Sequence, residues 1–164
     1  MADFLYQTEL DNLEALVQRQ EKKARFQPAR QAELDWLTEQ GIPDSVRQFY
    51  EVAEPTRTVE SEGVYLIPIA KMMDVNKNVV PGAVTSQFGY IVIAETVSGD
   101  AFCVNIHSLD ADGQPPIYFA NHERLVTGAT IDDLRKNTRQ VTPTFRQFLQ
   151  RFAAGKLPYD YFME

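Results

Sequence analysis

GDAFCVNIHSLDADGQPPIYFANHE, residues 99–123, is the stretch that decides the fold of this chain. Apolar residues alternate with small or polar ones in its first half, at Phe102, Val104 and Ile106, and again in its second half, at Ile117 and Phe119. A period of two is typical of β-strands, because successive side chains of a strand point to opposite faces of the sheet. The stretch therefore predicts two strands.

The residues between these two strands favour a reversal of the chain. Asp110, Asp112 and Gly113 tolerate the left-handed backbone that turns require, and Pro115 and Pro116 stiffen the start of the second strand. We therefore expect a β-hairpin with long arms that forms the core of a sheet.

Three helices are predicted before the first strand, over residues 3–25, 28–41 and 42–55. Pro28 and Pro43 fit the first turns of the second and third helices, Gly41 fits a left-handed C-terminal cap, and Pro55 ends the third. Each helix carries an apolar stripe at helical spacing: Leu10, Leu13, Leu16 and Val17; Leu34 and Leu37; Val46, Phe49 and Tyr50.

The middle of the chain predicts further strands separated by irregular segments. Residues 56–62 are polar and turn-like, and residues 63–73 predict a strand in which Pro68 indicates a sheet edge or a bulge. Residues 74–87 show no clear period, so we expect a mobile loop there. Residues 88–95 are nearly all apolar and predict a central strand that leads into the hairpin. The predicted sheet is an antiparallel meander.

Two helices are predicted after the hairpin. Thr130, followed three residues later by Asp133, resembles a capping box at the start of a short helix over residues 131–137. A second helix is expected over residues 142–155, and its apolar face should pack on the sheet. That face consists of Phe145, Phe148, Leu149 and Phe152. The order of elements predicts a single α+β domain.

Composition limits the classes of function. A chain of 164 residues is long enough for one ordinary core, and its longest apolar run is too short to cross a bilayer. The amino-terminal residues lack the pattern of a signal peptide, so we expect a cytoplasmic protein without a membrane partner. The single cysteine, Cys103, excludes an internal disulfide. The net charge of −7, with the acidic excess in residues 1–123, argues against nucleic-acid binding and favours a basic partner.

Several short motifs occur in an order that resembles the SUKH superfamily, which is named for fungal cell-wall synthesis regulators and includes many bacterial proteins. The motifs are Ile42-Pro43-Asp44 before a helix, Leu66-Ile67-Pro68-Ile69, Ser98-Gly99-Asp100, Pro116-Ile117-Tyr118 with His122-Glu123, and Thr144-Phe145 to Leu149. The resemblance covers residues 29–155. The predicted 74–87 loop and the N-terminal helix depart from the family pattern, which leaves the subfamily and the partner open.

The resemblance implies a curved antiparallel sheet packed against helices, with residues 28–164 as the SUKH-like domain and residues 1–27 as an N-terminal helical extension. It also implies a binding module. Since the sequence offers no convincing active site, we expect a non-catalytic protein without a cofactor, either a monomer or a weak dimer. Bacterial members are similar to immunity proteins that neutralise a cognate toxin, often a nuclease. An intracellular scaffold or regulator of the same fold is the alternative within this class.

An enzymatic alternative starts from the two histidines. His107 and His122 occur on the two arms of the predicted hairpin and could face each other, and Asp110 or Glu123 could complete a metal site for a hydrolase. The histidines lack the spacing of a known metal motif, so we expect ordinary hydrogen-bonded side chains and no metal. Cys103 could act as a nucleophile with either histidine, but a cysteine in the middle of a strand is more often a buried apolar filler.

Acidic side chains form the candidate partner-binding surface. A basic toxin would be attracted to clustered carboxylates, which raise the rate of association. We expect these side chains to be exposed, and the alternative is that they form an ordinary solvated surface. The candidates are Glu51, Glu54, Glu60, Glu62, Asp110 and Asp112.

Overall fold

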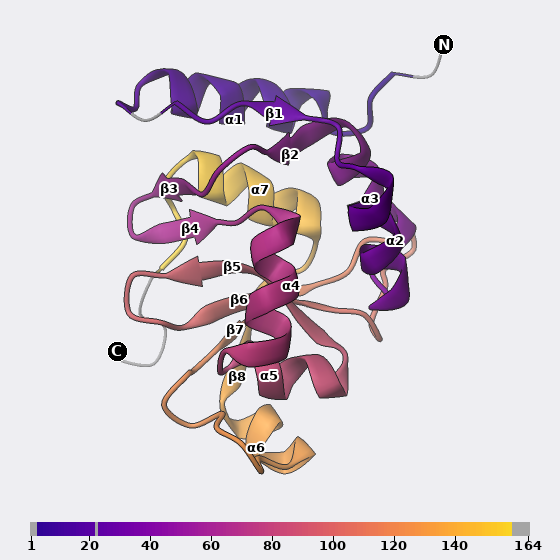
Figure 1. Cartoon of the computed structure of the whole chain (residues 1–164), viewed down its shortest axis with the longest axis vertical. Coiled ribbons are helices and arrows are strands. Elements are labelled where there is room, and N and C mark those ends of the chain that lie inside the picture. Colours follow the sequence, from indigo (N-terminus) through magenta and orange to yellow (C-terminus); the bar gives the residue numbers. More distant parts are fainter. Residues whose placement is uncertain (1–2, 22, 159–164) are drawn as a thin grey trace.

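A six-stranded antiparallel sheet lies at the centre of an α+β fold in the computed structural model, which describes residues 3–21 and 23–158 (Figure 1). Its strands follow chain order, so the sheet is the predicted meander. They are β3 (Val59–Ser61), β4 (Val64–Leu66), β5 (Tyr90–Thr96), β6 (Ala101–Asn105), β7 (Ile117–Ala120) and β8 (Thr138–Thr142).

The predicted hairpin is confirmed as β6 and β7. Phe102 pairs with Phe119 and Val104 with Ile117, so the large apolar side chains of both strands share one face. Every residue of β6 is buried, including Cys103, whose side chain points to the face opposite Phe102 and Val104. A strand that is buried throughout must be covered on both faces of its sheet.

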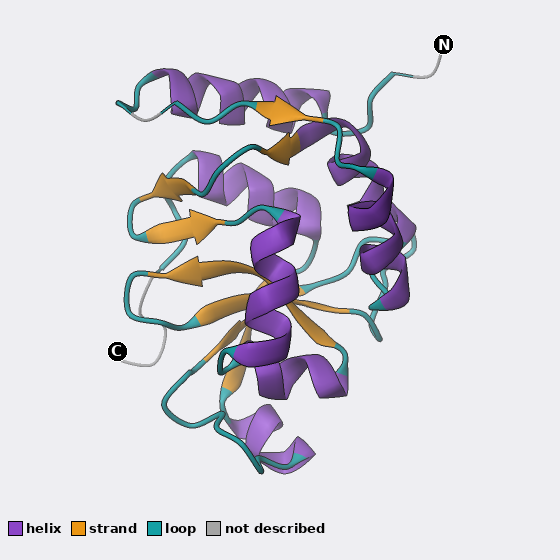
Figure 2. Ribbon diagram, viewed as in Figure 1, coloured by secondary structure: helices purple, strands orange, loops and turns teal. Residues whose placement is uncertain are grey.

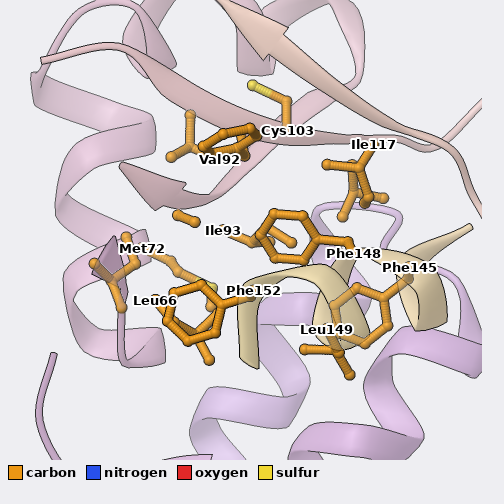
Figure 3. Packing of buried hydrophobic residues seen from close by; sticks show 14 of the residues in the cluster. Leu66, Met72, Val92, Ile93, Cys103, Ile117, Phe145, Phe148, Leu149 and Phe152 are labelled. Atoms are coloured by element: carbon orange, nitrogen blue, oxygen red, sulfur yellow. The ribbon is translucent and has the colours of Figure 1, made fainter. Parts of the chain in front are cut away.

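Helices supply both covers (Figure 2). Helix α7 (Phe145–Ala153) packs on the face that carries Phe102, and the ring centroids of Phe102 and Phe148 lie 5.5 Å apart. Figure 3 shows Phe148 of this helix among the buried apolar side chains of the core. On the opposite face lie α4 (Ile69–Asn78) and α5 (Gly82–Thr85), where the Thr85 hydroxyl lies 3.9 Å from the Cys103 sulfur. The predicted burial of Phe148 against the sheet is confirmed, since its side chain is fully buried.

The three predicted N-terminal helices are confirmed as α1 (Gln7–Gln18), α2 (Gln31–Glu39) and α3 (Asp44–Ala53). Gly41 follows α2 with a φ of 80°, the left-handed conformation expected of a residue after a helix C-terminus. Two short strands, β1 (Phe26–Gln27) and β2 (Glu54–Pro55), pair separately from the main sheet. Within the described ranges, no helix combines the length and apolar character needed to span a bilayer.

The N-terminal residues share the core of the rest of the chain. The fully buried ring of Tyr6 packs edge-on against Phe49 of α3 and Phe145 of α7. The Arg146 guanidinium lies over the same ring, 4.9 Å from its centroid, and donates a hydrogen bond to the Glu9 carboxylate on α1. Helix α1 is therefore joined to α7 by both apolar and charged contacts.

Two predictions for the middle of the chain are wrong. The strand predicted over residues 63–73 ends at Leu66, and Pro68 precedes the first turn of α4. The loop predicted over residues 74–87 is the end of α4, followed by α5 and the 3₁₀ helix η1 (Ser86–Phe88). Ile69, Met72 and Val75 recur at helical spacing and are buried, which explains why this segment is helical.

The edge strands β3 and β8 are not among the predicted elements. Strand β3 lies within the segment expected to be a turn, and β8 follows the short helix α6 (Ile131–Lys136) directly. Both are short and partly exposed, so they lack the apolar pattern of the central strands. The predicted capping box of α6 is confirmed, because the Thr130 side chain accepts a hydrogen bond from the backbone N–H of Asp133.

Candidate functional site

The two histidines lie at opposite ends of the hairpin. His107 follows β6, whereas His122 follows β7 next to the start of β6, where Ala101 pairs with Ala120. The expectation that they could face each other is therefore wrong. In the described part of the chain, no three His, Cys, Asp or Glu side chains are grouped so that they could hold a metal ion.

Each histidine has a local partner. The His122 Nδ1 lies 2.7 Å from an oxygen of the buried Asp100 carboxylate, which also accepts the backbone N–H of His122. The His107 Nε2 lies 3.1 Å from the Phe88 carbonyl oxygen. These contacts fix the two ends of the hairpin and leave the histidines in structural roles.

Cys103 is a buried filler, as expected. Its side chain is fully buried on the face of the sheet that α5 covers, and burial raises the pKa of its thiol to about 12, with the Thr85 hydroxyl opposing the shift. A thiol with so high a pKa carries almost no thiolate at neutral pH, so it is a poor nucleophile.

The predicted acidic surface is divided between two regions. Glu60 and Glu62 lie at the β3–β4 turn, at one side of the molecule in Figure 1. Asp110 and Asp112 lie on the loop between β6 and β7, which contacts the start of α3 through a hydrogen bond from the Ser45 hydroxyl to the Gly113 carbonyl. Glu51 is exposed on α3. These carboxylates cannot act as one continuous patch.

Glu54 belongs to neither surface. Only 6% of it is exposed, so the expectation that its side chain is exposed is wrong. Its carboxylate accepts a hydrogen bond from the backbone N–H of Ile69, the first residue of α4, at 2.9 Å. A buried acceptor satisfied by a helix N-terminus has a structural role, which the sequence around Glu54 does not reveal.

A surface groove of about 580 Å³ lies beside the β3–β4 turn. Glu60 and Glu62 are predicted binding residues. The prediction does not include their neighbours Ser61 and Gly63, nor the residues that come from elsewhere in the chain: Leu16 on α1, Gln20 just after it, and Val97 in the β5–β6 turn. We call this the β3 groove, and it is lined by Leu16, Gln20, Glu60, Ser61, Glu62, Gly63 and Val97. Val97 is 60% exposed, so the groove combines carboxylates with an accessible apolar side chain.

The β3–β4 turn holds Glu62 in an unusual conformation. Glu62 and Gly63 are the two central residues between the paired residues Ser61 and Val64, and their φ values are 47° and 83°. Two positive φ values are typical of a type I′ hairpin turn, in which asparagine or glycine is preferred. A glutamate in this conformation costs on the order of 1 kcal/mol. It is the only residue other than glycine with a positive φ within the described ranges.

Helix α1 supports the position of this turn. The Gln20 side chain donates a hydrogen bond of 2.6 Å to the Glu60 carbonyl oxygen, so the helix and the edge strand are fixed relative to each other. Gly155, after α7, lies on the other side of the turn, where an added Cβ would come 2.8 Å from the Glu62 side chain. The turn therefore lies between the segments that follow α1 and α7.

The α+β fold with an antiparallel sheet is the fold class that the SUKH resemblance implies, but a fold class alone does not identify a family. The resemblance therefore stays a prediction. No protein-family model matches the sequence, and a search of curated proteins finds no match either.

Proposed function

We propose that this protein is a non-catalytic cytoplasmic binding protein that captures a basic protein partner in the β3 groove. The SUKH resemblance suggests an immunity protein, with a nuclease toxin as its partner. The observation that carries the proposal is the left-handed backbone of Glu62 at the rim of the groove. Strain of this kind accumulates at functional sites, because relaxing it would change the side chain that acts there.

The composition of the groove suits a basic partner. Glu60 and Glu62 are exposed carboxylates. Val97, which directly follows β5, is an exposed apolar side chain that a partner could also contact. A nuclease presents lysine and arginine where it binds its polyanionic substrate. Carboxylates at the rim of an interface attract such a surface and increase the rate of association.

The structural roles of the reactive side chains support a function in binding. His122 is hydrogen-bonded to the Asp100 carboxylate and His107 to the Phe88 carbonyl oxygen, and burial keeps the Cys103 thiol protonated. The separation of His107 from His122 removes the arrangement on which the metal-dependent alternative was based.

The test compares charge reversal on the two acidic surfaces. The partner is first sought by pull-down with the product of the adjacent gene, because toxins and their antidotes are commonly encoded together. The variant Glu60→Lys/Glu62→Lys should slow association with that partner, and higher salt should slow the wild type in the same direction. The matched control is Glu51→Lys/Asp112→Lys, which also reverses two exposed charges but lies outside the groove. Equal association rates for wild type and both variants, at low and high salt, would refute the proposal.

A second variant separates strain from binding. Glu62→Asn keeps a polar side chain and suits the left-handed backbone, so it should stabilise the fold by about 1 kcal/mol. If Glu62 contacts the partner, the same variant should bind more weakly although it folds more stably. A variant that is more stable and binds normally would show that Glu62 is not part of the interface.

A further inference from the structure

Two buried glutamates lie side by side where α2, β2 and α4 meet. Glu33 on α2 and Glu54 on β2 are each only 6% exposed, and their carboxyl groups are within hydrogen-bonding reach of each other. Buried carboxylates normally need a cation beside them, because an uncompensated charge is poorly solvated in a protein interior. Among the residues that the structure describes, Arg30 is the cationic side chain that affects both glutamates, and its guanidinium is largely exposed.

The two carboxyl groups have different partners. The Glu33 carboxylate accepts a hydrogen bond from the backbone N–H of Arg30 at 3.0 Å, and the Arg30 side chain lies 3.4 Å away. Glu54 accepts the backbone N–H of Ile69 at the start of α4, and besides Glu33 and Arg30 the fully buried Tyr50 of α3 is a titratable group near it. Glu33 is therefore the better site for the negative charge.

The pKa values of the pair move apart for these reasons. Burial opposes the ionisation of Glu33, but the hydrogen bonds and charge of Arg30 outweigh it and lower the pKa of Glu33. Burial raises the pKa of Glu54, and the neighbouring negative charge of Glu33 raises it further. When the pair holds one proton, these shifts therefore favour the proton on Glu54 and the charge on Glu33.

We propose that Glu33 and Glu54 form a proton-held latch that joins α2 to the N-terminus of α4. With Glu54 protonated, its hydroxyl donates to the Glu33 carboxylate while its carbonyl oxygen accepts the Ile69 N–H. Loss of the proton places two carboxylates in contact beside the pocket that both side chains line, and their repulsion pushes α2 away from β2 and α4.

The tryptophan on α2, Trp36, can report this movement by its fluorescence. A second groove, of about 430 Å³, lies between α2 and α4 and is lined by Trp36, Gln40, Met73, Asn76 and Lys77. Trp36 is the single tryptophan of the chain. Opening of the latch should alter the surroundings of its indole ring, so intrinsic fluorescence reports the state of the latch.

The direction of the pH effect follows from the raised pKa of Glu54. A group whose pKa is raised by folding stabilises the folded state below its unfolded pKa, and this contribution is lost as the pH rises through the folded value. The wild type should therefore become more stable as the pH falls from the weakly alkaline range through the raised pKa of Glu54 toward the usual glutamate value. The contribution of one proton is at most a tenfold change in the unfolding equilibrium constant per pH unit.

The deciding experiment measures urea unfolding across this pH range for the wild type and for Glu54→Gln. Glutamine imitates the protonated side chain, because its amide can donate to Glu33 and accept from Ile69. The variant should be more stable than the wild type at about pH 8, with a pH slope reduced by up to one proton. Glu39→Gln, an exposed change on α2, should keep the wild-type slope. A wild-type slope in Glu54→Gln would overturn the proposal.

Two further measurements keep the proposal testable if the variant fails to fold. Carbon-13 NMR of the wild-type glutamate carboxyl groups should show one that titrates above the usual glutamate range, and the Trp36 fluorescence should change with the same midpoint. Glu33→Gln should move that midpoint to lower pH, because it removes the neighbouring charge. A Glu54 carboxyl group that titrates at or below the usual glutamate value would overturn the proposal.

Discussion

Removing the Asn76 side chain should be among the most damaging single changes in this protein. Asn76 is a buried residue of α4, and its side-chain amide bonds to both backbone groups of Val92 in β5. The Asn76 Nδ2 donates to the Val92 carbonyl at 3.0 Å, and its Oδ1 accepts the Val92 N–H at 2.8 Å. The pairing of β5 with β6 is irregular between Val92 and Ala94, so the asparagine stabilises the strand where its register shifts.

The magnitude follows from the groups left without partners. Asn76→Ala would leave the N–H and C=O of Val92 unpaired in the interior, where each costs about 1 to 3 kcal/mol, so we expect a loss of about 2 to 6 kcal/mol. The Nδ2 also donates to the Met72 carbonyl, which lies within α4. Asn78→Ala is the matched control, because Asn78 is exposed on the same helix and its side chain donates to the Asp74 carboxylate.

Urea unfolding gives the free energies, and hydrogen exchange at the Val92 amide tests the mechanism. The Val92 N–H should exchange faster in Asn76→Ala and should be unaffected in Asn78→Ala. Equal stability of the two variants would refute the reasoning, as would a large loss of stability with unchanged protection of Val92.

Three further predictions concern the core. Phe148→Ala should lower the free energy of unfolding by about 3 to 5 kcal/mol, and a melting temperature equal to that of the exposed-site control Gln147→Ala would contradict the packing of α7 on the sheet. Tyr50→Phe should leave stability unchanged or raise it by about 1 kcal/mol, because the buried Tyr50 hydroxyl has no hydrogen-bond partner among the described residues, and calorimetry showing a clear loss would contradict this. Cys103 should resist alkylation at about pH 8 until the protein is denatured, and rapid labelling of the folded protein, followed by mass spectrometry, would show that its thiol is accessible.

The parts of the fold that were predictable from the sequence are those with a strong local signal. The alternation around Phe102 and Phe119 indicated the central hairpin, and the phenylalanines of α7 indicated its buried face. The Thr130 capping box was likewise local, since its two partners lie three residues apart. In each case the pattern and the contact that it predicts lie within one element or one hairpin.

The errors came from ambiguous or non-local signals. Pro68 suits the edge of a strand and also the residue before a helix, and the apolar residues on both sides of it concealed the change of period. Strand β8 is polar at its exposed positions and is ordered by pairing with β7. The burial of Glu54 is not visible in the local sequence, because its partner Ile69 lies fifteen positions further along the chain. The β3 groove could not be predicted for the same reason, since its lining residues come from segments that are far apart in the sequence.

The packing of α1 on α7 has a consequence for synthesis on the ribosome. The Glu9–Arg146 contact joins residues 137 positions apart, so α1 is made long before the helix that covers its apolar stripe. Leu10 and Leu13 are therefore exposed in the nascent chain until α7 has been made. Exposed apolar side chains of this kind can bind chaperones or other nascent chains. Formation of the complete core then depends on one late event, the arrival of α7 between the sheet and α1.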